Sequence, residues 1–146
     1  MILPFDSDGY LPMGEHLATW DELANRFGHS GRRDWLLEGL RDALLALKVA
    51  GCAVAYIDGS FVTDKTLPKD YDACWDARGV RVKDLDPVFL DMTNDRVRQK
   101  AKFRGEFFPS HVVENRAGTT FLEFFQRRKD TGEPKGIVRI NLSSVT

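Results

Sequence analysis

The chain has 146 residues and a formal net charge of −1, with 42% hydrophobic and 29% charged residues. This length suits one domain with a sizeable core, and this composition is typical of a soluble globular protein. The near-neutral charge gives no overall reason for the chain to wrap nucleic acid, although a local basic cluster could still contact it. No internal repeat, low-complexity stretch or linker interrupts the sequence, so we predict a single domain over residues 1–146.

Two features of the sequence concern the cellular compartment. The N-terminus lacks a basic region followed by a long apolar run, and no stretch approaches the roughly 18 apolar residues of a membrane span. We therefore predict a cytoplasmic protein with no membrane partner. Cys52 and Cys74 lack the spacing of metal ligands, and a reduced pair of small core residues is favoured over a disulfide.

The first third of the chain is predicted to hold an extended arm and two helices. Residues 1–17 contain two prolines and two glycines among apolar residues, which predicts an extended arm packed on the body. A first helix is indicated after Thr19, because Thr19 and Glu22 have the spacing of a capping box, and Gly28 can end this helix. A longer helix is predicted over residues 32–50.

The longer helix has one apolar face. Its apolar side chains recur at steps of three and four residues, and we expect Trp35, Leu40 and Leu47 to pack against a sheet. Arg32 and Arg33 lie at its start, where a positive charge opposes the helix dipole. These arginines could contact phosphate or a partner, but a solvated helix end is the favoured interpretation.

A buried strand and a tight turn follow this helix directly. The apolar run over residues 53–57 predicts a short strand, and Gly59 and Ser60 after it suit a turn to which another group approaches closely. Asp58 lies immediately before Gly59 and could belong to a site at this turn, but we interpret it as a strand-end residue that caps the turn. The backbone N–H groups and the hydroxyl of such a turn suit phosphate oxygens.

Two aspartates begin the next predicted strand. If residues 70–75 form this strand, its two-residue period puts Asp70 and Asp72 on the same face. Two carboxylates at this separation are costly unless water or a cation compensates their charge. Oxygen ligands of this kind suit Mg²⁺ (or Mn²⁺), which completes its coordination shell with phosphate and water.

The rest of the chain supplies the remaining elements of an α/β (α+β) fold. A charged helix is predicted over residues 94–102, and a solvated helix is favoured there over a nucleotide or RNA contact. Residues 103–109 predict a third strand, residues 119–126 a short apolar helix, and residues 136–142 a half-buried strand at a sheet edge. The element order predicts a small mixed sheet with helices packed against it.

The Gly59-Ser60 turn and the aspartate pair together resemble the signature of the nucleotidyltransferase superfamily. The resemblance covers residues 53–75, and the chain is most similar to the minimal single-domain prokaryotic members, which include components of toxin–antitoxin pairs. It implies that Gly59 and Ser60 hold the triphosphate of an NTP. It also implies that Asp70 and Asp72 bind Mg²⁺ (or Mn²⁺) during transfer of a nucleoside monophosphate to a hydroxyl.

The resemblance further implies a third metal-binding carboxylate on a later strand. Glu106 is our choice, because it begins the next aromatic, strand-like run, whereas Asp86 and Asp91 look like turn or helix residues. Lys65 and Lys69 flank the gap between the two halves of the motif, and either could reach a phosphate as a point charge.

Two functions from different classes are compatible with this pattern. The first is an enzyme that transfers a nucleotide to a hydroxyl on protein, RNA or a small molecule. The second is a catalytically degraded domain of the same fold that binds another protein as an antitoxin or regulatory partner. An unrelated α+β domain with a coincidental motif is a third interpretation.

Overall fold

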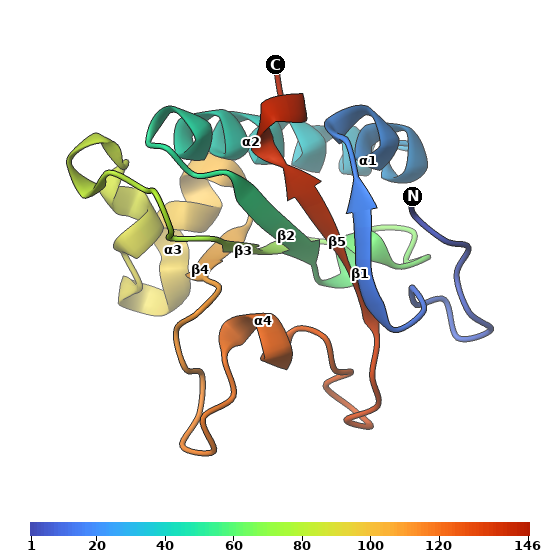
Figure 1. Ribbon diagram of the computed structural model, residues 1–146. Helices are drawn as coiled ribbons and strands as arrows, with labels where there is room; N and C mark the ends of the chain where they lie inside the picture. The colour runs from blue at the N-terminus through green and yellow to red at the C-terminus, as the bar shows by residue number, and fades with distance from the viewer.

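The computed structural model describes all 146 residues and contains one five-stranded mixed sheet (Figure 1). The strands are β1 (Gly14–Ala18), β2 (Val54–Asp58), β3 (Asp72–Trp75), β4 (Glu106–Pro109) and β5 (Gly136–Asn141). They lie in the order β1-β5-β2-β3-β4. β1 is parallel to β5 and β3 is parallel to β4, whereas β2 runs antiparallel to both of its neighbours. The predicted α+β class is confirmed.

Helices cover one face of the sheet and enclose the main core. This core contains 28 buried residues. Leu40 and Leu47, which were predicted to face the sheet, are fully buried in it, and Ala55 and Ile57 of β2 point into it from the other side. None of the helices combines the length and the apolar character that a membrane crossing requires. The covering helices are α1 (Trp20–Phe27), α2 (Gly31–Val49) and α3 (Thr93–Phe103).

The first two helices begin at side-chain caps. The Thr19 side chain accepts a hydrogen bond from the backbone N–H of Glu22, and the Glu22 carboxylate accepts one from the Thr19 N–H, so the predicted capping box is confirmed. α1 ends at Gly28, and the Ser30 side chain caps α2. Each cap satisfies a backbone N–H that would otherwise lack a partner, so these boundaries follow from the local sequence.

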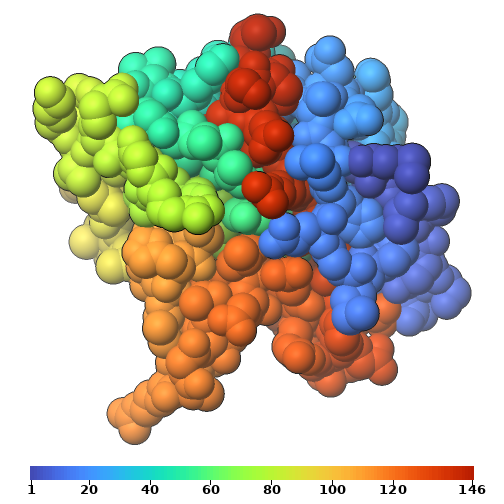
Figure 2. Space-filling model, in the orientation of Figure 1, coloured from blue at the N-terminus to red at the C-terminus, as the bar shows by residue number.

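The opposite face of the sheet is only partly covered. The short helix α4 (Phe121–Phe124) lies across the sheet from α1 and α2 (Figure 1). The loop before α4 projects from the body as the orange segment at the lower left of Figure 2. A second cluster of six buried residues lies on this face: Val54, Tyr56, Cys74, Phe108, Phe125 and Ile137.

Two predictions about the sheet edge are wrong. The predicted extended arm ends in strand β1, which contains its residues 14–17, and β5 therefore lies between β1 and β2 instead of at an edge. The segment Gly14–Ala18 contains no β-branched or aromatic residue, so its own composition does not favour a strand. The segment forms a strand because it pairs with β5, which is more than a hundred residues away in the chain.

The start of α2 also differs from expectation. Trp35 is 43% exposed instead of buried, and the guanidinium groups of Arg32 and Arg104 lie 5.2 and 4.5 Å from its ring centre. Arg33, which was predicted to be solvated, is fully buried. Arg33 is buried because its guanidinium has backbone hydrogen-bond partners on the loop after β2. Trp35 lies at the surface, where cationic side chains pack against its ring.

The first turn of α3 has an unusual backbone. Asn94, Asp95 and Arg96 have φ angles of 49°, 54° and 58°, which place three consecutive non-glycine residues in the left-handed region. This conformation costs about 1–2 kcal/mol per residue for an L-amino acid. Surrounding contacts must offset this cost, and the turn fixes the direction in which Arg96 leaves the helix.

Candidate functional site

Three neighbouring strands each bring one carboxylate to the same end of the sheet. Asp58 ends β2, Asp72 begins β3 and Glu106 begins β4. Asp58 pairs in register with Asp72, and Asp72 pairs in register with Glu106. Residues directly opposite each other on paired strands project from the same face, so these side chains form a row, which we call the carboxylate row. The row lies on the partly covered face, because Ile57, Ala73 and Phe107 next to it point into the main core.

The turn after β2 is shaped by Gly59. Its φ is +84°, and a Cβ on this residue would lie 3.1 Å from Asp72 Oδ2 and 3.2 Å from the Asp72 backbone nitrogen. Glycine fits this position both because it tolerates positive φ and because it leaves room for Asp72. Ser60 begins the short 3₁₀ turn that follows, so the predicted Gly-Ser turn lies against the aspartate strand.

Arg33 holds the loop that continues from this turn. Its guanidinium donates hydrogen bonds to the carbonyl oxygens of Phe61 at 2.5 Å, Thr63 at 2.8 Å and Lys65 at 2.7 Å. Burial lowers the pKa of Arg33, and the charge of Asp64 counteracts this shift. The prediction of a solvated helix end for Arg33 is therefore wrong, and its contacts are structural ones that position the loop beside the site.

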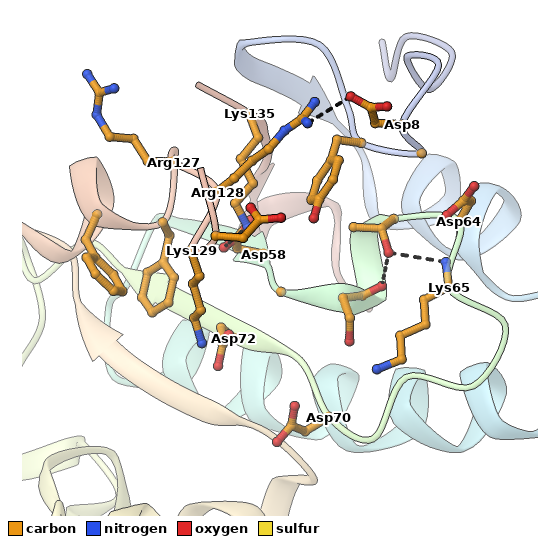
Figure 3. A pocket seen from close by; sticks show the side chains of 18 residues that line it. Asp8, Asp58, Asp64, Lys65, Asp70, Asp72, Arg127, Arg128, Lys129 and Lys135 are labelled. Atoms are coloured by element: carbon orange, nitrogen blue, oxygen red, sulfur yellow. Dashed lines mark hydrogen bonds and ion pairs between the residues drawn. The ribbon is translucent and has the colours of Figure 1, made fainter. Parts of the chain in front are cut away.

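These elements enclose a cleft of about 560 Å³ (Figure 3). Its volume is within the usual range of small-molecule binding sites. Glu106 does not line this cleft but lines a smaller cavity that also contains Asp72 in its wall. Lys69 is exposed and lies outside the cleft lining. The predicted residues that do line the cleft are Gly59, Ser60, Lys65, Asp70 and Asp72.

The two alternative candidates for the third carboxylate are engaged elsewhere. Asp86 caps the short helix after it and forms an ion pair with Lys102. Asp91 forms an ion pair with Arg98 at 3.0 Å. Neither lies on a strand of the sheet, whereas Glu106 pairs in register with Asp72, so Glu106 is the candidate that joins the carboxylate row.

The carboxylates of the row have raised pKa values, mainly because they are buried. The pKa of Asp72 is raised to about 7, firstly by burial and then by the negative charges of Asp58, Glu106 and Asp70. Lys129 counteracts this shift in part, and Figure 3 shows its side chain extending toward Asp72. Near neutral pH the site therefore gains from taking up positive charge, either as a proton or as a cation.

Asp58 is a residue of the candidate site that the sequence interpretation set aside in favour of a turn cap. Its side chain is only 2% exposed, and its Oδ2 accepts a hydrogen bond from Lys135 Nζ at 3.0 Å. Burial raises the pKa of Asp58, and Lys135 counteracts that shift. The other carboxylate oxygen, Oδ1, is buried and has no hydrogen-bond partner. An acceptor of this kind is costly unless another group satisfies it, so the interpretation of Asp58 as a turn cap was incomplete.

The wall opposite the carboxylates is basic and was not predicted. Arg128 donates hydrogen bonds to Asp6 and Asp8 at 2.9 Å each, so this arginine ties the N-terminal segment to the cleft. The cations of this wall follow one another closely in the sequence, but nothing there relates them to a motif some sixty residues earlier. They are Arg127, Arg128, Lys129 and Lys135, shown around the cleft in Figure 3.

The donor set of the cleft fits a hard divalent cation, although it is not a complete cage. No group of three His, Cys, Asp or Glu side chains is placed to hold a metal ion by itself. Mg²⁺ usually takes one or two carboxylates and completes its shell with water and substrate phosphates. Asp70 and Asp72, which both line the cleft, would supply the one or two carboxylates of such an open site.

The fold and the site together define a small α+β domain with a carboxylate-rich cleft at one end of a mixed sheet. The chain belongs to DUF6932, a family of unknown function, whose profile matches residues 3–141. No curated protein and no solved structure matches the chain. The matched range contains all five strands and therefore the whole carboxylate row.

Proposed function

We propose that this protein binds a nucleoside triphosphate together with Mg²⁺ (or Mn²⁺) and transfers the nucleoside monophosphate to a hydroxyl acceptor. The observation that carries the proposal is the carboxylate row, with Asp70 and the Gly59-Ser60 turn beside it in one cleft. Burial and then the neighbouring negative charges raise the pKa of Asp72, and a divalent cation would offset those charges.

The charges of the cleft suit a triphosphate with a bound cation. Carboxylates form its floor, and the side chain of Lys129 extends toward Asp72 from the basic wall. Arg127 points away from the carboxylates and donates a hydrogen bond to the carbonyl oxygen of Gly132 at 3.0 Å. A phosphate chain in the cleft would contact Lys129 on one side and metal held by carboxylates on the other. The Gly59-Ser60 turn supplies backbone N–H groups and a hydroxyl for phosphate oxygens. Arg33 fixes the loop that continues from this turn.

The proposed reaction is an in-line displacement at the α-phosphorus. The acceptor oxygen forms a bond to this phosphorus, the bond from the phosphorus to the β-phosphate oxygen breaks, and pyrophosphate leaves. The hydroxyl proton passes to solvent. When bound, the cation neutralises charge on the phosphates and lowers the pKa of the attacking hydroxyl. The residues of this chain bind, orient and neutralise the reactants, which is the main requirement of such a transfer.

Thermal unfolding with Mg²⁺ and each of the four NTPs tests the binding step. A ligand that binds only the folded state at 100 times its Kd adds about 2.7 kcal/mol to the free energy of unfolding. We expect a higher melting temperature for the wild type, and loss of this increase in Asp70→Asn and Asp72→Asn. Both variants should fold at least as well as the wild type without metal, because each removes one member of a repelling cluster. Asp42→Asn, an exposed change on α2, should keep the full increase.

Turnover then separates the enzyme from a binding module of the same fold. Release of pyrophosphate, with the labelled α-phosphate joined to an acceptor, supports the enzyme, and Glu106→Gln should reduce this turnover more than it reduces NTP binding. Metal-dependent NTP binding without turnover supports the antitoxin-like or regulatory module. A wild type unaffected by Mg²⁺ and any NTP, with both aspartate variants destabilised, would instead make the aspartates structural and refute the proposal.

A further inference from the structure

A second cavity adjoins the nucleotide cleft on the far side of Asp72. Its volume is about 340 Å³, and it shares Asp72 and Lys129 with the cleft. Glu106 lies in the wall of this cavity and not in that of the cleft. The carboxylate row therefore separates two spaces, one large enough for a nucleotide and one smaller. The aromatic side chains of the smaller space are Phe108, Phe121, Phe124 and Phe125.

Arg96 supplies an uncommitted cation to this second cavity. Its guanidinium lies 3.9 Å from the centre of the Phe108 ring and 5.9 Å from that of Phe121. The nearby carboxylates of Asp95 and Glu106 form ion pairs with Lys100 instead, at 3.4 and 3.7 Å. The Nε of Arg96 is buried and has no hydrogen-bond partner. Arg96 is thus stacked on an aromatic face, and its guanidinium makes no hydrogen bond or ion pair within the protein.

The backbone that presents Arg96 is held in a costly conformation. Asn94, Asp95 and Arg96 form the left-handed turn at the start of α3. An ordinary helical start would direct residue 96 differently, because its Cα–Cβ bond would follow the right-handed helix. Strained backbone of this kind gathers at sites where a side chain must be aimed.

We infer that the second cavity binds the hydroxyl acceptor, and that Arg96 selects acceptors that carry a phosphate or carboxylate group. This inference rests on the proposed nucleotidyl transfer. A guanidinium presents a planar set of donors that matches phosphate and carboxylate oxygens in pairs. Glu106 and Glu114, also in the lining, repel an anion, and the other cation of the lining, Lys129, extends toward Asp72. Arg96 is therefore the cation that is left for the anionic group of the acceptor. Its hydroxyl then faces Asp72 and the nucleotide cleft.

The aromatic lining adds a preference for a flat group on the acceptor. Phe121 and Phe124 are both partly exposed, and Phe124 lines the cleft as well as the second cavity. Stacking on such rings is favourable for any planar group. The acceptor class is therefore a hydroxyl compound with a planar ring and one anionic group.

Matched compounds that differ in one anionic group test the inference. The protein is first saturated with Mg²⁺ and α,β-methylene-ATP, which fills the cleft but does not react. Calorimetry then compares adenosine 5′-monophosphate with adenosine, and 4-hydroxyphenylacetate with 4-hydroxybenzyl alcohol. We expect at least one anionic compound to bind tenfold or more tightly than its neutral partner, and the two pairs distinguish phosphate from carboxylate.

Variants of Arg96 identify the source of that preference. Arg96→Gln should abolish it, and Arg96→Lys, which keeps the charge but loses the planar donors, should keep only part of it. Arg98→Gln is the matched control, because Arg98 lies on the same helix and pairs with Asp91 outside the cavity. None of these variants should change the affinity for Mg²⁺ and α,β-methylene-ATP.

The possible failures are distinguishable. If the wild type does not bind Mg²⁺ with α,β-methylene-ATP, the proposed function is refuted and the inference with it. If that complex forms but anionic and neutral compounds bind equally, or Arg96→Gln keeps the preference, only the assignment of Arg96 and of the acceptor class is overturned.

Discussion

The two faces of the sheet differ in what they carry: one holds the main apolar core, and the other carries the candidate site. The face under α1, α2 and α3 holds 28 buried residues in one apolar cluster. The opposite face holds a cluster of six, and at its end three carboxylates stand in register on adjacent strands. Both faces are made from the same strands, because alternate residues of β2, β3 and β4 point to opposite sides.

This division lets the site hold groups that would be unfavourable in a core. The main core supplies the apolar burial that offsets the cost of crowded carboxylates, an unpartnered Asp58 oxygen and a left-handed turn. The site face in turn keeps its charges near an open cleft, where the proposed cation and phosphate chain would lie. Changes on the two faces should therefore have opposite consequences for stability.

The largest expected loss of stability is on the helix-covered face. Leu40 is fully buried in the main core, so Leu40→Ala should lower the free energy of unfolding by roughly 2–5 kcal/mol in urea denaturation. Leu67→Ala removes the same atoms from a side chain that is 63% exposed and should cost far less. Equal costs for the two variants would mean that the helix-covered face does not provide the main core.

On the site face, stability should depend on pH through Asp72. Its pKa of about 7 in the folded protein is above the value of about 3.9 in an unfolded chain. Between these values the folded state binds more protons, so the free energy of unfolding falls as pH rises from about 4 to 7. The Asp72 contribution to this fall is up to about 4 kcal/mol, from roughly 1.4 kcal/mol per pKa unit.

Denaturation curves across this pH range measure the effect. Asp72→Asn should reduce the fall in the free energy of unfolding and make the protein more stable than the wild type at pH 8. Asp42→Asn should leave the dependence of this free energy on pH unchanged. Identical pH profiles for the wild type and Asp72→Asn would show that the carboxylate row does not perturb Asp72.

The features that local sequence determines were predictable. The capping box at Thr19, the leucine face of α2 and the strands that contain Ala55 and Ala73 each depend on residues close together in the chain. The Gly59-Ser60 turn and Asp72 were found for the same reason, although Asp70, which was predicted to lie on the same strand, precedes β3. Their closeness to each other follows from the antiparallel pairing of β2 with β3, which returns the chain to the same end of the sheet.

The features that were missed depend on partners far away in the chain. β1 is a strand because β5 pairs with it, and Arg33 is buried because three carbonyl oxygens of the loop after β2 surround it. Asp58 joins the site through Lys135, which lies 77 residues later. No periodicity or spacing around Arg33 or Asp58 carries this information, since a charged residue at a helix start or strand end is ordinarily solvated.

The smallest predicted effect tests the strain on the site face. Asp95 has a φ of 54° in the left-handed turn, and its carboxylate makes only an exposed ion pair with Lys100 at 3.4 Å. Asp95→Gly and Asp95→Ala both remove this ion pair, so the difference between their free energies of unfolding depends only on the backbone preferences of glycine and alanine. Glycine adopts positive φ without the steric cost of a Cβ, although it is more flexible in the unfolded chain. We expect Asp95→Gly to be about 0.5–1 kcal/mol more stable than Asp95→Ala in urea denaturation. At Arg41, in the right-handed interior of α2, the same pair of substitutions should give the opposite order, with alanine the more stable. If alanine is favoured at both positions, residue 95 is not left-handed in solution, and Arg96 is not directed at Phe108 by strain.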